Sequence, residues 1–227
     1  MLIETKNLSL EYKDGKNITK ALQNVNLSFD YNGFYGMLGP SGSGKSSLLY
    51  LLSGIKKPTH GEIIYCGYPY PESIYLRDKL RRQEMGFIFQ SFFLIKYLTV
   101  KENIFVGADP HDKTQVRWVD ELLHYLGLEN MAHKFPDELS GGQRQRVSIA
   151  RALANKPKVI FADEPTAFLD HENGKKVVDL LKNVAKKACV IIVTHDESFI
   201  DSDTIVHRLW DGVLVEPAKV PDLPKLA

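Results

Sequence analysis

The stretch Gly39-Pro-Ser-Gly-Ser-Gly-Lys45-Ser46 decides the fold. It matches the pattern G-x-x-x-x-G-K-[ST], in which glycines let backbone N–H groups converge on a phosphate without steric hindrance from a Cβ atom. Lys45 supplies a positive charge for the β- and γ-phosphates of a nucleotide, and the hydroxyl of Ser46 is a ligand for Mg²⁺. These residues therefore predict a phosphate-binding loop for ATP.

The segments on either side of this loop supply the context that it needs. Residues 34–38 form a short apolar run before the loop, and a helical pattern over residues 45–53 follows it and stops at Gly54 and Pro58. A helix in this place presents its positive N-terminal end to the phosphate. The context favours a phosphate loop over a flexible Gly/Ser turn. The residues expected to contact ATP from the loop are Gly39, Pro40, Ser41, Gly42, Ser43, Gly44, Lys45, Ser46 and Ser47.

The rest of the chain reads as an α/β protein. Apolar and polar residues alternate around Leu8–Tyr12 and again over residues 25–31, which predicts two antiparallel strands near the N-terminus. Residues 85–89, 159–162 and 189–193 are instead continuous apolar runs, typical of buried parallel strands, with helical patterns around residues 116–126 and 177–184. The segment 91–155 lacks a strong strand signal and reads as a helical insertion.

These patterns together predict one fold class. We expect a P-loop NTPase core with a mostly parallel sheet, an N-terminal antiparallel β subdomain and an inserted helical subdomain. A single ATP-binding domain would span residues 1–227, with the core formed by residues 1–90 and 156–227 and the helical subdomain by about residues 91–155.

Two carboxylates end one of the buried strands. Asp163 and Glu164 follow the run Val159-Ile-Phe-Ala162. Alone, an aspartate at a strand end usually caps a turn. Beside a phosphate loop, Asp163 becomes a candidate for the Mg²⁺ shell, and Glu164 a candidate for polarising the water that attacks the γ-phosphate.

Two adjacent glycines lie at the start of a long helical pattern further along the chain. Leu139-Ser-Gly-Gly-Gln143 reads as a capping box with Ser140 at the N-cap and Gln143 three residues later. Gly141 and Gly142 weaken a helix by about 1 kcal/mol each relative to alanine. They make sense if a ligand approaches the backbone there, and a second phosphate is the natural candidate.

With these motifs in order, the chain resembles the nucleotide-binding subunits of ABC (ATP-binding cassette) transporters. The sequence LSGGQ at 139–143 matches the signature of that family, and the resemblance runs from Tyr12 to Gly212. It implies that Tyr12 stacks on adenine, that Gln90 approaches Mg²⁺ and links the site to the transporter, and that His195 contacts the γ-phosphate. Without the resemblance, Tyr12 would read equally well as one apolar residue of a strand.

The resemblance also implies a split site. Ser140, Gly141, Gly142, Gln143 and Asp170 would act on the nucleotide bound by a second copy, which makes the chain a homodimer when ATP binds. The sequence 166–170, Thr-Ala-Phe-Leu-Asp, departs from the family, which usually has a small or polar residue where Phe168 stands. This departure puts in question the geometry of the contact made by Asp170.

The implied function is an ATPase that powers an integral-membrane permease from the cytoplasmic face of the membrane. The segment from Gln90 to Val106 is rich in large apolar residues, and it reads equally as core packing or as a groove that receives a permease helix. Within the family, the sequence around residues 82–90 and 98–103 resembles that of the lipoprotein-release, macrolide-efflux and bacitracin-resistance group. That group implies an exporter, or a system that transmits force, for peptide, antibiotic or lipid-linked cargo.

Composition excludes other classes of protein. The 227 residues carry 29 Lys and Arg and 28 Asp and Glu, so near-neutral charge gives no argument for a nucleic-acid partner. Cys66 and Cys189 form neither a disulfide framework nor a zinc site, and no apolar run approaches the ~20 residues of a membrane helix.

The alternative function is a regulatory or non-transport ABC ATPase that acts through a protein partner. Intact Glu164 and His195 argue against a regulator without turnover, and LSGGQ would have no role in a P-loop kinase.

Overall fold

The computed structural model describes residues 1–15, 17–195, 197, 200 and 204–215. Contacts divide the chain into two compact units. The first comprises Met1–Asp30, Tyr35–Tyr70 and the chain from Val193 onward, and the second comprises Tyr31–Phe34 and Pro71–Ile192.

The first unit contains the predicted antiparallel sheet. Strands β1 (Ile3–Asp14) and β2 (Asn17–Phe29) pair with Ile3 opposite Phe29 and Asp14 opposite Asn17. On its other edge β1 pairs antiparallel with β4 (His60–Tyr65), which continues to β5 (Tyr68–Pro69). The alternating apolar residues of β1 and β2 point inward, since Leu8, Leu10 and Val25 are buried. This alternation is why the sequence predicted these two strands.

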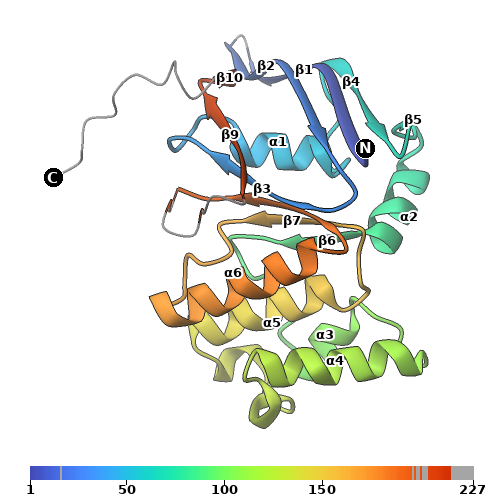
Figure 1. The fold of residues 1–227 in the computed structure, drawn as a ribbon, viewed down its shortest axis with the longest axis vertical. Coiled ribbons are helices and arrows are strands. Elements are labelled where there is room, and N and C mark those ends of the chain that lie inside the picture. The colour runs from blue at the N-terminus through green and yellow to red at the C-terminus, as the bar shows by residue number, and fades with distance from the viewer. Residues whose placement is uncertain (16, 196, 198–199, 201–203, 216–227) are drawn as a thin grey trace, which may run out of the picture. The chain divides into compact units, whose positions relative to one another are not determined.

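The same unit carries most of the strand that leads into the phosphate loop. Strand β3 (Gly33–Leu38) pairs in parallel with β9 (Ile205–Trp210), and β9 pairs antiparallel with β10 (Val213–Val215). Helix α1 (Lys45–Leu52) follows the loop, as expected. In Figure 1, α1 is drawn in light blue beside the ribbon of β1 and β2.

The second unit contains the buried parallel strands and the helices. Strand β7 (Val159–Asp163) lies between β6 (Met85–Ile88) and β8 (Cys189–Val193), and β6 and β7 run parallel. Every residue of β7 and β8 is buried, which explains their uninterrupted apolar sequence. The helices are α2 (Ile74–Glu84), α3 (Val100–Phe105), α4 (Lys113–Tyr125), α5 (Gly141–Leu153) and α6 (His171–Ala185).

The described chain between residues 91 and 155 has no strand, as the sequence predicted. Helices α3 and α4 both pack on α5 (Figure 1), and short 3₁₀ turns at Glu129–Met131 and Pro136–Glu138 join α4 to α5. The capping box that opens α3, between Thr99 and Glu102, fixes where this helix begins. In the part of the chain that is described, no helix is both long and apolar enough to cross a bilayer.

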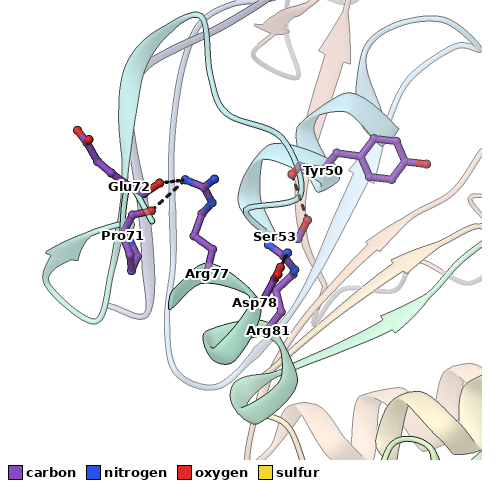
Figure 2. Close-up of polar contacts among 7 residues, drawn as sticks. All are labelled: Tyr50, Ser53, Pro71, Glu72, Arg77, Asp78 and Arg81. Atoms are coloured by element: carbon purple, nitrogen blue, oxygen red, sulfur yellow. Dashed lines mark hydrogen bonds and ion pairs between the residues drawn. The ribbon is translucent and has the colours of Figure 1, made fainter. Parts of the chain in front are cut away.

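Helix α2 is held by its own charged residues. None of its residues is buried. Arg77 donates to the carbonyl oxygens of Pro71 and Glu72 at 3.0 Å each, and Asp78 pairs with Arg81 one turn later (Figure 2). The Arg77 bonds fix the segment that enters α2, so this helix depends on local polar contacts more than on burial.

A histidine packed among aromatic rings gives the first unit a pH-dependent stability. The ring of His207 stacks on Tyr35 with centroids 6.3 Å apart and meets Phe29 edge-on at 5.8 Å. Burial lowers the pKa of His207 below its ordinary value of 6.5. The unfolded chain therefore takes up a proton more readily than the folded chain, so stability present at neutral pH is lost as pH falls below about 6.5.

We expect His207→Phe to flatten the fall in thermal midpoint between pH 7 and pH 5. Phenylalanine keeps the aromatic packing and removes the titrating group. His133→Phe, at an exposed histidine of the second unit, serves as the matched control and should keep the wild-type profile. Parallel profiles for His207→Phe and wild type in calorimetry would contradict this assignment.

Candidate nucleotide site

The phosphate loop leads into a helix end without a side-chain cap. Gly44 is the N-cap residue of α1 and offers no side-chain oxygen to the first turn. A helix N-terminus that no side chain caps suits an anion, which can accept from backbone N–H groups there. This geometry fits a phosphate group.

Glycine is required at two positions of the loop because the chain passes close to other backbone. At Gly44, with φ of 101°, a Cβ atom would lie 2.4 Å from the carbonyl oxygen of Ala21. At Gly39 the corresponding distance, to the carbonyl oxygen of Leu209, would be 2.1 Å. Side chains at either position would displace the loop from β2 or β9, so the glycines fix its shape.

Lys45 folds back over the loop. Its ammonium donates to the carbonyl oxygens of Gly39 and Pro40 at 2.8 Å each, and the residue is only 8% exposed. The hydroxyl of Ser43 is buried and has no hydrogen-bond partner among the described residues. Buried polar groups are normally satisfied, so this hydroxyl fits a loop that a ligand completes.

Tyr12 is positioned by two contacts with its own unit. Its hydroxyl lies 3.1 Å from the Ser47 hydroxyl, and the ammonium of Lys56 lies 3.9 Å from the ring centroid. A cation over a tyrosine face is a favourable contact that fixes ring orientation. The structure therefore holds Tyr12 at the phosphate loop and not within the core, which supports its assignment to the nucleotide.

The two carboxylates stand where β7 ends. Asp163 is the last residue of the strand and is 7% exposed. Glu164 follows with φ of 47°, in the left-handed region that glutamate seldom adopts. Such backbone strain costs about 1–3 kcal/mol and gathers at functional sites. Two successive carboxylates therefore stand at the end of a buried strand, the second of them on a strained backbone.

Gln90 and His195 both follow parallel strands, as predicted. Strand β6 ends at Ile88, one residue before the predicted end, so Phe89 and Gln90 lie beyond it. His195 comes two residues after β8 and is exposed, whereas Thr194 before it is fully buried. Both side chains therefore stand at the carboxyl ends of strands, where ligands bind in open α/β sheets.

The LSGGQ segment forms the predicted capping box. The backbone N–H of Ser140 donates to the Gln143 side chain at 2.8 Å, and the backbone N–H of Gln143 donates back to the Ser140 hydroxyl at 3.3 Å. A Cβ atom at Gly142 would lie 3.1 Å from the carbonyl oxygen of Phe168. Part of the requirement for glycine at 142 is therefore internal packing, whereas Gly141 has no such close neighbour.

Asp170 is a helix cap in this structure. Its carboxylate accepts from the backbone N–H of Asn173 at 2.9 Å and so begins α6. The hydrogen bonds from Asn173 hold the pKa of Asp170 below its usual range, so the group stays ionised. The Asn173 side-chain amide donates to the other carboxylate oxygen at 2.6 Å. This role explains an aspartate at 170 without a second subunit.

The residues predicted for Mg²⁺ have the right chemistry. Ser46 lies in the first turn of α1, and Asp163 and Gln90 lie at strand ends in the second unit. In the ranges that the structure covers, no group of three or more His, Cys, Asp or Glu could hold a metal ion. A serine hydroxyl and an aspartate carboxylate are each the kind of oxygen ligand that Mg²⁺ takes, usually few in number and together with water and substrate phosphates.

Comparison with known proteins establishes the family. The family model described as ABC transporter matches residues 22–167 of the chain. The chain belongs to the ABC transporter ATP-binding family, and it is an ATPase subunit of that class.

The relatives match more than nine-tenths of the chain. An uncharacterized ABC transporter ATP-binding protein of Methanocaldococcus jannaschii is 44% identical over 95% of this chain and 98% of its own. The lipoprotein-releasing system ATP-binding protein LolD of Rickettsia typhi is 39% identical over 92% and 95%. A putative hemin import ATP-binding protein, HrtA, of Staphylococcus saprophyticus is 37% identical over 94% and 99%.

A solved structure supports the fold. The ATP-binding cassette MJ0796, in a dimeric post-hydrolysis state bound to ADP and Pi, matches with a TM-score of 0.88. It is 37% identical, and the match covers 95% of this chain and 97% of that one. The predicted α/β fold class with a P-loop NTPase core is therefore confirmed.

Proposed function

We propose that the whole chain, residues 1–227, acts as one ATP-binding domain that hydrolyses ATP to drive a membrane permease. The observation that carries the proposal is the uncapped start of α1 behind a glycine-shaped loop that contains buried Lys45. Lys45 neutralises the β- and γ-phosphates, and the hydroxyl of Ser46 together with Asp163 and Gln90 would hold Mg²⁺. The metal, when bound, neutralises charge on the phosphate oxygens. Tyr12 stacks on the adenine base.

Glu164 acts on the attacking water in this proposal. A carboxylate accepts a hydrogen bond from water and so increases its nucleophilicity toward the γ-phosphate. His195 donates to an oxygen of that phosphate. Charge stabilisation and positioning supply most of the catalysis in phosphoryl transfer, so each of these groups should matter for turnover.

The site is completed by a second copy of the chain. Ser140, Gly141, Gly142 and Gln143 present an N-terminal helix end that suits a phosphate, and Asp170 lies on an exposed turn. One chain carries one set of motifs, so two chains related by a two-fold axis would form two sites. The dimeric state of the related cassette bound to ADP and Pi supports this arrangement.

The permease partner would bind the segment that begins at Gln90. Phe93 and Tyr97 are 66% and 80% exposed, whereas Val100 and Ile104 further along are fully buried. The segment thus has exposed aromatic residues near Gln90, which support a permease contact there, and core residues further along. Exposed aromatic residues at this density are typical of a binding surface. The chain would then work at the cytoplasmic face of the membrane, without a nucleic-acid partner.

The class of cargo is proposed from the subgroup that the motifs resemble. The related proteins are named for lipoprotein release and for hemin import. We propose an exporter, or a system that transmits force, for peptide, antibiotic or lipid-linked cargo. The sequence around residues 82–90 and 98–103, which resembles the lipoprotein-release, macrolide-efflux and bacitracin-resistance group, supports this proposal.

A charge at the proposed permease surface tests the function. Tyr97→Glu should reduce by more than about tenfold the amount of integral-membrane protein that co-purifies with the tagged chain from solubilised membranes of its own cells. Burying a glutamate against an apolar partner is costly, whereas the exposed residue contributes little to folding. Tyr125→Glu, at a 52% exposed tyrosine of α4, is the matched control. Equal recovery with wild type and Tyr97→Glu would contradict the proposal.

A further inference from the structure

Two phenylalanine rings join segments that lie far apart in the sequence. Phe168, five residues after Asp163, meets the ring of Phe92 edge-on with centroids 4.9 Å apart. Phe92 belongs to the segment that follows Gln90, and it is half-buried. Phe168 is 50% exposed, so its ring is covered on one side only.

Helix α5 fixes the Phe92 side of this contact. Arg151 donates to the carbonyl oxygens of Phe92 and Phe93 at 2.9 Å and 2.7 Å. Near the start of the same helix, the guanidinium of Arg144 lies 5.9 Å from the Phe92 ring centroid, and its Nε donates to the carbonyl oxygen of Leu139 at 3.1 Å. Two arginines of α5 therefore hold both the backbone and the ring of Phe92.

The Phe168 side is fixed by the first turn of α5. A Cβ atom at Gly142 would stand 3.1 Å from the Phe168 carbonyl oxygen, and one at Gly141 would stand 3.9 Å from the Phe168 Cβ. Phe168 thus packs closely against Gly141 and Gly142 of the LSGGQ segment. Two residues later, Asp170 caps α6, so this packing also limits where that carboxylate can stand.

We infer that Phe168 is a positioning residue that couples the segment after Gln90 to the LSGGQ turn and to the Asp170 turn. The functional part of this inference rests on the proposed function, in which the first segment faces the permease and the other two face the second copy. A small residue at 168 could not reach Phe92. The aromatic ring therefore transmits a displacement of the permease-facing segment to both partner-facing turns through one packed contact.

An aromatic pair of this kind contributes about two- to tenfold to a local equilibrium. Coupling is also reciprocal, because each partner must affect the other by the same free energy. Loss of Phe92 should therefore loosen the turn at 166–170, and loss of Phe168 should loosen the segment 91–97.

Hydrogen exchange measured by mass spectrometry on the full chain tests this coupling. We expect Phe92→Ala to accelerate exchange about two- to tenfold in peptides covering residues 166–170. Phe168→Ala should do the same in peptides covering residues 91–97, and the double variant should exceed neither single variant by more than about twofold. Phe168→Tyr should restore wild-type exchange. Phe135→Ala, at a 45% exposed phenylalanine elsewhere in the second unit, is the matched control and should change neither peptide.

Turnover distinguishes positioning from packing alone. Phe168→Ala should lower kcat for ATP hydrolysis about three- to tenfold with KM changed less than twofold, and Phe168→Tyr should recover most of it. The inference would be overturned if Phe92→Ala left exchange at residues 166–170 unchanged, or if Phe168→Ala left exchange at residues 91–97 unchanged. Coupled exchange with unchanged kcat would overturn its functional part. A wild-type chain without ATPase activity would refute the proposed function, and the exchange experiment would still decide the coupling.

Discussion

Lys45→Ala is expected to reduce ATP turnover by about a thousandfold. The ammonium is the only side-chain charge within the phosphate loop, and it is held against the loop by the carbonyl oxygens of Gly39 and Pro40. Without it, charge that develops on the γ-phosphate loses a preorganised partner, and removal of one such group typically costs a factor of 10²–10³. Phosphate release under saturating ATP measures the loss.

The fold should survive this substitution. The ammonium of Lys45 donates to the loop carbonyl oxygens of Gly39 and Pro40. Truncation should cost little compared with a core change, and the thermal midpoint should shift by a few degrees at most. Lys176→Ala, at an exposed lysine of α6 that pairs with Glu172, is the matched control and should keep wild-type turnover. Wild-type rates in the Lys45→Ala protein would remove the phosphate-loop assignment.

Glu164→Gln is expected to lower turnover by about a hundredfold or more while ATP still binds. Glutamine keeps the size of the side chain and loses the anionic oxygen that accepts a proton from water. The strained backbone at 164, with φ of 47°, would be kept, because the two side chains have the same shape. Single-turnover phosphate release, together with a nucleotide titration, separates lost chemistry from lost binding. Weakened binding with normal turnover of the bound ATP would contradict the role of Glu164.

Local patterns were enough to predict most of the fold. Continuous apolar runs identified β7 and β8 because both faces of these strands are buried, and alternation identified β1 and β2 because one face is buried. Strand β4 escaped prediction because its first three residues are exposed and Gly61, at φ of 80°, interrupts the pattern. Strand β9 escaped because His207 and Arg208 break its apolar sequence, although aromatic rings and an ion pair with Glu197 accommodate them.

The candidate site was predictable only where a motif is contiguous. The phosphate loop and the capping box at Ser140 follow from neighbouring residues, and the structure has both. The cation over the Tyr12 ring comes from Lys56, which lies far from it in the sequence. The contact between Phe92 and Phe168 and the left-handed backbone at Glu164 likewise depend on the folded chain. Pattern and spacing carry no information about such contacts.

The split site, formed by two copies around two ATP molecules, is the central claim, and the mass of the Glu164→Gln protein in solution tests it most directly. Static light scattering should show a monomer without nucleotide and a dimer with ATP, with the dimer fraction rising with ATP concentration by mass action. Ser140→Arg in the same background should abolish the dimer, because a bulky side chain would block the approach of a phosphate to the start of α5. A Glu164→Gln protein that binds ATP tightly and stays monomeric would contradict the split site.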